Sequence, residues 1–381
     1  CGSSSSAPPL LPGEPDDDIE NMDPDTAAEM LADWESSGHS DFDAEAFRHW
    51  DEDGAIPTSC AKCHSTYGFR DFMGSDGSQP GQVDNPAELG TTVNCDACHT
   101  EETQALDSVM FPSGAIATDL GKEAICMQCH QGRESTVSMN NHIAGAEVAD
   151  DDTVDADLHF RNIHYYAAGA TLFGGSAKGA YQYTLPGDDG VIGTPDDEEK
   201  YGYYDTRNPH VAAADTCIEC HDAHTLQLKV DLCSQCHTQS LHDIRMAGSV
   251  TDYDGDGNNQ EGIYYEILSL QTKLYDAIRD YAANVIGEPV VYDSHAYPYF
   301  FYDNGNPAIY PNRYQSWTAR LLRAAYNYQY AQKDPGAFAH NPKYVIQFLY
   351  DSIADLDAHP MVTVPNFEDL VRNDSGHFDA G

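Results

Sequence analysis

The stretch Cys60-Ala61-Lys62-Cys63-His64 governs the architecture of this chain, because its spacing is repeated four more times. Two thiols three positions apart can form thioether bonds to the two vinyl groups of one haem, and the adjacent His can bind the iron. The pattern therefore predicts five covalently attached haems c. The five motifs are Cys60, Cys63 and His64; Cys95, Cys98 and His99; Cys126, Cys129 and His130; Cys217, Cys220 and His221; and Cys233, Cys236 and His237.

Zinc sites and disulfides are the other common uses of paired cysteines, and both predict a different pattern. A four-ligand zinc site joins one Cys-x-x-Cys pair to a second pair of ligands, whereas here each pair has its own His and the number of pairs is odd. A disulfide framework gives no reason for His to follow the second Cys each time. The motifs use ten of the eleven cysteines, which favours haem attachment.

The composition fits a fold in which cofactors replace part of the apolar core. Hydrophobic residues make up 41% of the chain, and each haem is a large apolar body against which side chains can pack. We predict a mainly α fold with much irregular loop, in which the haems form the core. We expect a tether at residues 1–44, a pentahaem cytochrome domain at 45–250 and a helical domain without haem motifs at 251–381.

Helical periodicity is strongest after the last motif. A stripe of apolar residues from Ile263 to Val285 recurs every three or four positions, and Gly287 follows it. Two further helices are predicted, one over about 316–333 and one that begins after Asn341-Pro342. We expect these helices to pack as a small C-terminal bundle.

Histidines outside the motifs decide the second axial ligand of each iron. The chain has 17 histidines, of which twelve lie outside the motifs, enough for two His ligands on every haem. Iron held by two His has no open position for a substrate, which suits electron transfer rather than bond-making. Methionine is the other common ligand, but the chain contains eight, so His is the default expectation.

Chain position ranks the twelve candidates. His224 follows His221 by three residues, too close to turn back onto the same iron, so we expect it to bind a neighbouring haem. His340 stands just before a predicted helix, from which it could close over the haem layer. The preferred distal ligands are His49, His164, His210, His224 and His340; the competing candidates are His159, His142, His242 and His295; and surface or supporting positions are expected for His39, His359 and His377.

A second metal-binding pattern follows the haem motifs. In Asp252-Tyr253-Asp254-Gly255-Asp256-Gly257-Asn258, carboxylates alternate and Gly stands in the sixth place, as in the first half of a calcium loop. The twelfth place is Ile263 rather than a bidentate Glu, and Glu261 or Glu266 could substitute in a looser site. The candidate calcium ligands are Asp252, Asp254, Asp256, Asn258 and Glu261. A solvated acidic turn is the alternative.

Three segments resemble bacterial multihaem cytochromes c of respiratory chains. They are Asn162-Ile163-His164-Tyr165 with Ala168-Gly169-Ala170-Thr171-Leu172, Cys217-Ile218-Glu219-Cys220-His221-Asp222-Ala223-His224-Thr225, and Cys126-Met127-Gln128-Cys129-His130-Gln131-Gly132-Arg133. The resemblance covers roughly residues 45–350. It implies low-potential haems with two His ligands, arranged as an electron wire. The family includes membrane-anchored and extracellular members, some of which polymerise into haem filaments.

Charge and the first residues bear on location. With 63 acidic against 19 basic residues the net charge is -44, so nucleic acid and anionic lipid surfaces are not expected partners. Cys1, followed by Gly2 and the run Ser3–Ser6, is typical of a lipoprotein with a lipid anchor on Cys1 and an acidic tether. A short helix is expected near residues 26–34 of that tether. The alternatives are a start at an ordinary Cys and, for the acidity, adaptation to high salt. We expect a cell-surface or outer-membrane lipoprotein, or an extracellular protein.

Two classes of function are compatible with these patterns. The first is an electron carrier, not an enzyme, that passes electrons through its haems to a redox partner protein or an extracellular acceptor, with self-association into a polymer as a further expectation. The second is a multihaem reductase of the nitrite or hydroxylamine type, which needs one haem with a vacant distal position. All five motifs end in His and spare His are abundant, which favours the carrier.

Overall fold

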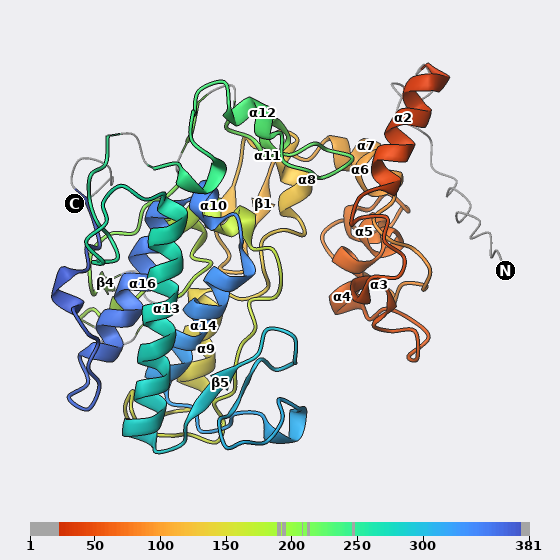
Figure 1. The fold of residues 1–381 in the computed structure, drawn as a ribbon. Helices are drawn as coiled ribbons and strands as arrows, with labels where there is room; N and C mark the ends of the chain where they lie inside the picture. The colour runs from red at the N-terminus through yellow and green to blue at the C-terminus, as the bar shows by residue number, and fades with distance from the viewer. Residues whose placement is uncertain are drawn as a thin grey trace. The chain divides into compact units, whose positions relative to one another are not determined.

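A computed structural model describes residues 23–188, 192, 196–207, 209–211, 214–245 and 248–374. Within them the chain forms helices, most of them short, three two-stranded sheets and long irregular segments (Figure 1). The predicted fold class, mainly α with much loop, is confirmed at this level. The chain divides into two compact units, which are described separately. Unit 1 is Cys1–Val109, Ala117–Cys129 and His210–Cys233, and unit 2 is Met110–Ile116, His130–Pro209 and Ser234–Gly381.

Short helices build unit 1. Its elements are α2 (Pro24–Glu35), α3 (Glu45–Arg48), α4 (Thr58–His64), α5 (Thr66–Met73), α6 (Cys95–Cys98), α7 (Glu101–Gln104), α8 (Glu123–Met127), α11 (Cys217–Cys220) and α12 (Val230–Cys233). Helix α2 confirms the short helix expected near residues 26–34. Its N-terminus is capped by the Asp23 carboxylate, which accepts a hydrogen bond from the Thr26 N–H. Strands β1 (Val109–Met110) and β2 (Ile116–Ala117) contain the borders between the units.

Helices α4 and α5 pack closely because one residue between them lacks a side chain. A Cβ atom on Gly68 of α5 would lie 2.4 Å from the backbone oxygen of Ala61 in α4, far inside van der Waals contact. The Ser65 hydroxyl caps α5 by accepting a hydrogen bond from the Gly68 N–H at 3.3 Å. This pair of helices carries the first motif, and its tight packing fixes the position of the motif within unit 1.

Unit 2 contains the longer helices. Its elements are α9 (Thr136–Gly145), α10 (Ala168–Ala177), β3 (Thr184–Leu185), β4 (Glu198–Glu199), the 3-10 helix η1 (Leu241–Asp243), α13 (Ile263–Tyr281), the π-helical segment η2 (Ala282–Ile286), β5 (Val290–Tyr292), β6 (Phe300–Tyr302), the 3-10 helix η3 (Tyr310–Asn312), α14 (Ala319–Lys333), α15 (Ala337–His340), α16 (Pro342–Asp357) and the 3-10 helix η4 (Phe367–Asp369). Strands β3 and β4 pair antiparallel, as do β5 and β6.

Helices α13, α14 and α16 pack against one another and supply much of the core of unit 2 (Figure 1). The apolar stripe predicted in the first of them is buried, with Leu270, Leu274 and Ile278 fully shielded from solvent. Full burial of each such side chain contributes about 1.5–3 kcal/mol to folding. Gly287, which follows the stripe, adopts a positive φ of 81° and ends the helical segment. The three helices expected from periodicity are therefore confirmed.

Buried ion pairs join the core helices of unit 2 to one another and to the segment that contains Arg372. Arg372 donates to the Asp351 carboxylate on α16 through Nε at 2.7 Å and Nη2 at 3.0 Å, and both side chains are almost fully buried. Arg320 on α14 approaches the Asp355 carboxylate at 3.1 Å. Because an unpaired buried charge is costly, these pairs fix the register of the segments they join.

The predicted division at residues 44/45 and 250/251 does not coincide with these units, since both are assembled from separate stretches of the chain. As a division by function it stays a prediction. No helix among the described residues combines the length and apolar character needed to cross a lipid bilayer. Cys1 and His377 lie outside the described residues.

Candidate functional site

The five Cys-x-x-Cys-His motifs adopt short helical turns. In the second and fourth motifs, α6 and α11 contain the two cysteines and the intervening pair of residues, and His99 or His221 follows directly. Residues three apart lie on the same side of a helix, so both thiols of a motif can reach one ligand. All ten motif cysteines are described; none forms a disulfide, and each is at least partly exposed. This geometry fits covalent haem attachment.

Cysteines of different motifs lie next to one another in unit 1. The side chains of Cys63 and Cys129 interact, and so do those of Cys126 and Cys217. The hydrogen bond that the Cys129 thiol donates to Cys63 is the main cause that raises the pKa of Cys129, and burial raises the pKa of Cys98 to about 12. These thiols are therefore protonated near neutral pH. Unit 1 brings attachment points from the first four motifs together, although they are far apart in sequence.

The ring of His64, in the first motif, is held by a backbone oxygen. Its Nδ1 lies 2.8 Å from the backbone oxygen of Ala46, to which it can donate a hydrogen bond. A backbone contact of this kind is usual for a His that binds a metal through its other ring nitrogen. In the fourth motif, Nδ1 of His221 lies 3.4 Å from the Leu226 oxygen in a similar arrangement. In both motifs a backbone oxygen therefore helps to orient the His ring.

One predicted distal ligand, His224, lies close to the His of the second motif. In unit 1 the rings of His99 and His224 are nearly parallel, with an interplanar angle of 10° and ring centroids 6.3 Å apart. The Asp222 carboxylate accepts hydrogen bonds from the backbone N–H groups of His224 and Thr225 at 3.1 and 2.8 Å, which orders the turn that carries His224. The structure therefore brings together the second motif and the residue that follows the fourth.

The other preferred candidates in unit 1 are more exposed. His49 accepts or donates a hydrogen bond at 2.8 Å with Glu45, and its ring contacts Trp50, which in turn contacts the His64 ring. The exposed His210 has its Nδ1 3.2 Å from the Ala214 oxygen. His49 is thus close to the first motif through an aromatic contact.

In unit 2 one preferred candidate, His164, lies near the third motif, and a series of contacts leads from there to the segment that carries another, His340. The His130 oxygen accepts a hydrogen bond from the Gly169 N–H at 2.8 Å, and its ring contacts Tyr166, two residues from His164. The Tyr166 N–H donates to the oxygen of Lys333 at 3.3 Å. The next residue, Asp334, binds Nδ1 of His340 at 2.9 Å. Burial acts to lower the pKa of His340, but Asp334 outweighs burial and raises it.

The competing candidates for distal ligands are His142, His159, His242 and His295. The first three contact another His or a Tyr, and the fourth is exposed. His142 Nε2 accepts a hydrogen bond from the His159 N–H at 3.1 Å, and burial with the charge of His159 lowers the pKa of His142 to about 4. The ring of His242 stacks on Tyr264 with centroids 4.0 Å apart. The side chain of His295 is 94% exposed.

One His in unit 1 is less exposed than its sequence position suggested. We expected His39 at the surface or in a supporting role, but it is half-buried, and burial lowers its pKa. Its backbone oxygen accepts a hydrogen bond from the Val93 N–H at 3.1 Å, and the Val93 oxygen accepts one from Nε1 of Trp34. These contacts place His39 close to the second motif. No local pattern could have found this, because the pairing spans more than fifty residues.

The acidic loop predicted as a calcium site precedes α13 in unit 2 and includes Asp252, Asp254 and Asp256. Burial is the main cause that raises the pKa of Asp254, of Glu266 and, to about 7, of Glu261. The pKa of Asp252 is lowered, because hydrogen bonds, including those from backbone N–H groups, outweigh its burial. Asn258 uses its side-chain amide to donate to Glu261 at 3.3 Å.

Comparisons with known proteins agree with the motif chemistry. Residues 45–131, which contain the first three motifs, match the family described as cytochrome c7 and related cytochrome c. The chain is 24% identical over 361 residues to the C-type polyheme cytochrome OmcB of Geobacter sulfurreducens, a match that covers 82% of this chain and 46% of the relative. It is also 24% identical over 378 residues to the C-type polyheme cytochrome OmcC of the same organism, which covers 83% of this chain and 45% of the relative. The chain thus spans about half the length of these relatives. No solved structure matches.

Proposed function

We propose that this multihaem c-type cytochrome of electron transport carries one haem on each of its five motifs and relays electrons without catalysing a reaction at an open iron. When bound, haem c supplies one-electron chemistry at its iron. The chain's own contribution is to attach the haems through paired thiols, to saturate each iron with two His and to hold the sites close together. Haems that complete the core of the motif region and a C-terminal helical bundle are part of this proposal.

The facing pair His99 and His224 is the observation that carries the proposal. A metal–imidazole nitrogen bond is about 2.0 Å long, so two imidazoles on opposite sides of one metal hold their ring centres roughly 6 Å apart. The 6.3 Å between these two ring centroids matches that separation. We therefore propose that His224, from the turn after the fourth motif, is the distal ligand of the second haem. A ligand shared in this way ties two neighbouring attachment sites to each other.

Second ligands for the other irons are proposed with support of different kinds. For His340, the Asp334 carboxylate holds Nδ1, which leaves Nε2 for a metal in the carboxylate–His arrangement common at metal sites. For His49 and His164, the support is their closeness to the first and third motifs. His210, His142, His159, His242 and His295 stay predictions.

Closely spaced attachment points support relay along the chain. Contacts between Cys63 and Cys129, and between Cys126 and Cys217, bring thiols of separate motifs side by side in unit 1. The net charge of -44 favours partners that are cationic or that meet the chain in salt water. We propose redox partner proteins or an extracellular acceptor, at the cell surface. The lipid anchor on Cys1 and self-association into a polymer are further proposals.

A substitution at the distal position tests the proposal. His224→Ala should convert one low-spin haem into a high-spin haem that binds carbon monoxide, because its iron loses one of two His ligands. The absorption spectrum of the haem-loaded protein, with and without carbon monoxide, measures this change. His359→Ala removes an imidazole of unit 2 that is expected only at the surface or in a supporting role, and it should leave the spectrum unchanged. An unchanged spectrum in His224→Ala would remove this residue from the ligand set.

A further inference from the structure

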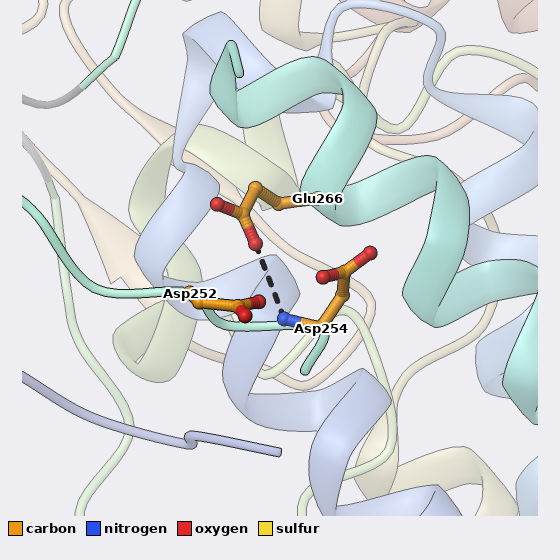
Figure 2. Close-up of side chains that lie close together, drawn as sticks. All are labelled: Asp252, Asp254 and Glu266. Atoms are coloured by element: carbon orange, nitrogen blue, oxygen red, sulfur yellow. Dashed lines mark hydrogen bonds between the residues drawn. The ribbon is translucent and has the colours of Figure 1, made fainter. Parts of the chain in front are cut away.

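The acidic loop before α13 is closed by a carboxylate from the helix itself. Side-chain oxygens of Asp252, Asp254 and Glu266 all lie within 4.8 Å of one another, and Figure 2 shows the three carboxylates around a common space. Ligands of one Ca²⁺ lie 2.3–2.6 Å from the ion, so no two of them can be more than about 5 Å apart. Asp254, Asp256 and Glu261 form a second such group, which shares Asp254 with the first.

Asp254 supplies an independent indication that a ligand is bound here. Its side chain is fully buried, at 0% exposure, and its Oδ2 has no hydrogen-bond partner. A buried carboxylate oxygen without a partner costs free energy that a bound cation would recover. Both acidic groups converge on this side chain.

Backbone N–H groups fix the carboxylates that surround Asp254. The Asp252 carboxylate accepts hydrogen bonds from the N–H groups of Gly255 and Gly257, both at 2.7 Å. Glu266 Oε2 accepts from the N–H groups of Tyr253 and Asp254 at 2.8 and 3.1 Å, the second of which is drawn in Figure 2. These bonds hold the oxygens in place before any ion arrives, which lowers the cost of ordering the loop on binding.

We propose that this loop binds one Ca²⁺ through the carboxylates of Asp252, Asp254, Asp256, Glu261 and Glu266. Glu266, in the first turn of α13, takes the place of the Glu that the twelfth position of the loop lacks. Several carboxylates on a loop suit Ca²⁺, which accepts six to eight oxygens in a flexible geometry, better than Mg²⁺, which needs strict octahedral geometry and keeps its water. The inference goes beyond the haem proposal and does not rest on it.

The bound ion would clamp the segment that follows the fifth motif onto α13. Arg245 donates to Glu266 Oε1 at 2.7 Å and to the Thr251 oxygen at 2.6 Å. The Ile263 N–H donates to the oxygen of Ile244 at 3.0 Å. Eight residues before Arg245, this segment carries His237, the proximal His of the fifth motif. The cation site is therefore built to keep that part of the chain in place.

The C-terminal segment rests on the same loop. The Tyr253 oxygen accepts a hydrogen bond from the Val371 N–H at 3.1 Å, and the Thr251 hydroxyl donates to Asp374 at 2.6 Å. A Cβ atom on Gly255 would lie 2.9 Å from backbone atoms of Asp369, so the loop and this segment are in close contact. Calcium should therefore raise the unfolding temperature of unit 2.

Calcium titration of the haem-loaded full chain, after removal of bound metal with a chelator, tests the proposal. Wild type should show a saturable site by calorimetry, and added Ca²⁺ should raise its unfolding temperature. Asp254→Asn should weaken affinity by at least the roughly 10–100-fold that follows loss of a supporting residue at a metal site. Asp256→Asn should weaken it as well, and since Asp256 is exposed, misfolding would not explain that loss.

Asp276→Asn is the matched control, because Asp276 is an exposed carboxylate on the same helix, α13. It makes the same change in charge and should leave both the affinity and the rise in unfolding temperature intact. The proposal is overturned if wild type shows no saturable calcium site. It is also overturned if both loop variants bind calcium like wild type, which would assign the binding to the acidic surface in general.

Discussion

The two units bury their apolar side chains in different ways. In unit 2, buried residues from α13, α14 and α16 belong to one large cluster. Among the described residues of unit 1, one cluster of three buried residues lies around Ile56 and another around Phe69. Motif cysteines border both of these, with Cys60 at the first and Cys98 and Cys129 at the second. Apolar burial stabilises a fold roughly in proportion to its area, so unit 2 is supported by its own side chains to a greater extent.

This difference indicates where the cofactors matter for folding. A small apolar cluster with attachment cysteines at its edge is a surface onto which a large apolar ring system can pack. We infer that haem attachment completes the core of unit 1, whereas the three long helices of unit 2 do not depend on it. Experiments that remove haem, break a buried pair or crowd a helix contact separate these two modes of stabilisation.

Withholding haem should have the largest effect. In a full chain produced without haem attachment, we expect amides of α13, α14 and α16 to stay protected from hydrogen exchange, while amides of unit 1 exchange freely, because local stability follows apolar burial. Hydrogen exchange read by mass spectrometry, with the haem-loaded chain as reference, measures both regions at once. Equal protection of unit 1 with and without haem would contradict the comparison.

Breaking a buried ion pair should destabilise unit 2 on its own. Arg372→Met leaves the buried carboxylate of Asp351 without its partner, which typically costs about 3–5 kcal/mol. Urea unfolding followed through the helical signal measures the loss. The control is Arg279→Met, because Arg279 and Asp303 are 3.7 Å apart and both about half exposed, and such a pair contributes about 0–1 kcal/mol. Equal losses of unfolding free energy in the two variants would show that burial of an ion pair does not determine its contribution to stability.

Crowding the contact between α4 and α5 should destabilise unit 1 by a smaller amount. Gly68→Ala forces a methyl group to within 2.4 Å of the Ala61 oxygen, and overpacking of this kind costs about 1–3 kcal/mol. Proteolysis of the haem-loaded chain should then cleave near the first motif sooner than in wild type. Ala105→Gly, at an exposed position at the end of α7, is a control with the opposite change in volume and should not alter cleavage there. Unaltered cleavage in Gly68→Ala would mean that the two helices can separate freely.

The smallest of these effects is expected from acid, which should lower the stability of unit 2 by protonating Asp152. Burial acts to raise the pKa of Asp152, but hydrogen bonds from Arg320 at 2.6 Å and Tyr281 at 2.7 Å outweigh it, so the pKa is lowered. A carboxyl group with a lowered pKa stabilises the fold above its unfolded pKa, and this stability is lost as pH falls through the folded pKa. Asp152→Asn should therefore flatten the acid limb of the unfolding temperature of unit 2. If the unfolding temperature of Asp152→Asn fell with decreasing pH as steeply as that of wild type, Asp152 would not contribute to the acid sensitivity of unit 2.

Local patterns predicted the helices and the attachment residues because both depend on short spacings. The apolar stripe of α13 needs a period of three to four residues, and each haem motif is five residues long. The assembly of each unit from separate stretches of the chain was not predictable in this way, since it depends on contacts such as the hydrogen bond from the Cys217 N–H to the Glu123 carboxylate. The close approach of the His99 and His224 rings also depends on tertiary structure. The sequence predicted only that His224 binds a haem other than the one attached to the adjacent motif of His221.

The calcium ligands of the acidic loop could also be predicted only in part from the sequence. Its alternating carboxylates were visible in sequence, but the twelfth position, Ile263, left the loop without its usual last ligand. Glu266 comes into position because α13 begins at Ile263 and turns this side chain back toward the backbone N–H groups of the loop. The sequence offered both Glu261 and Glu266; the folded loop brings the first, and helix α13 the second, within reach of Asp254.

The spin state and number of the bound irons test the central claim most directly. Electron paramagnetic resonance of the oxidised haem-loaded protein, combined with its intact mass, reports both quantities for the same sample. We predict five haems, one for each motif, all low-spin with two His ligands. A stoichiometric high-spin centre, or a mass that corresponds to fewer than five haems, would contradict the account of a saturated electron relay.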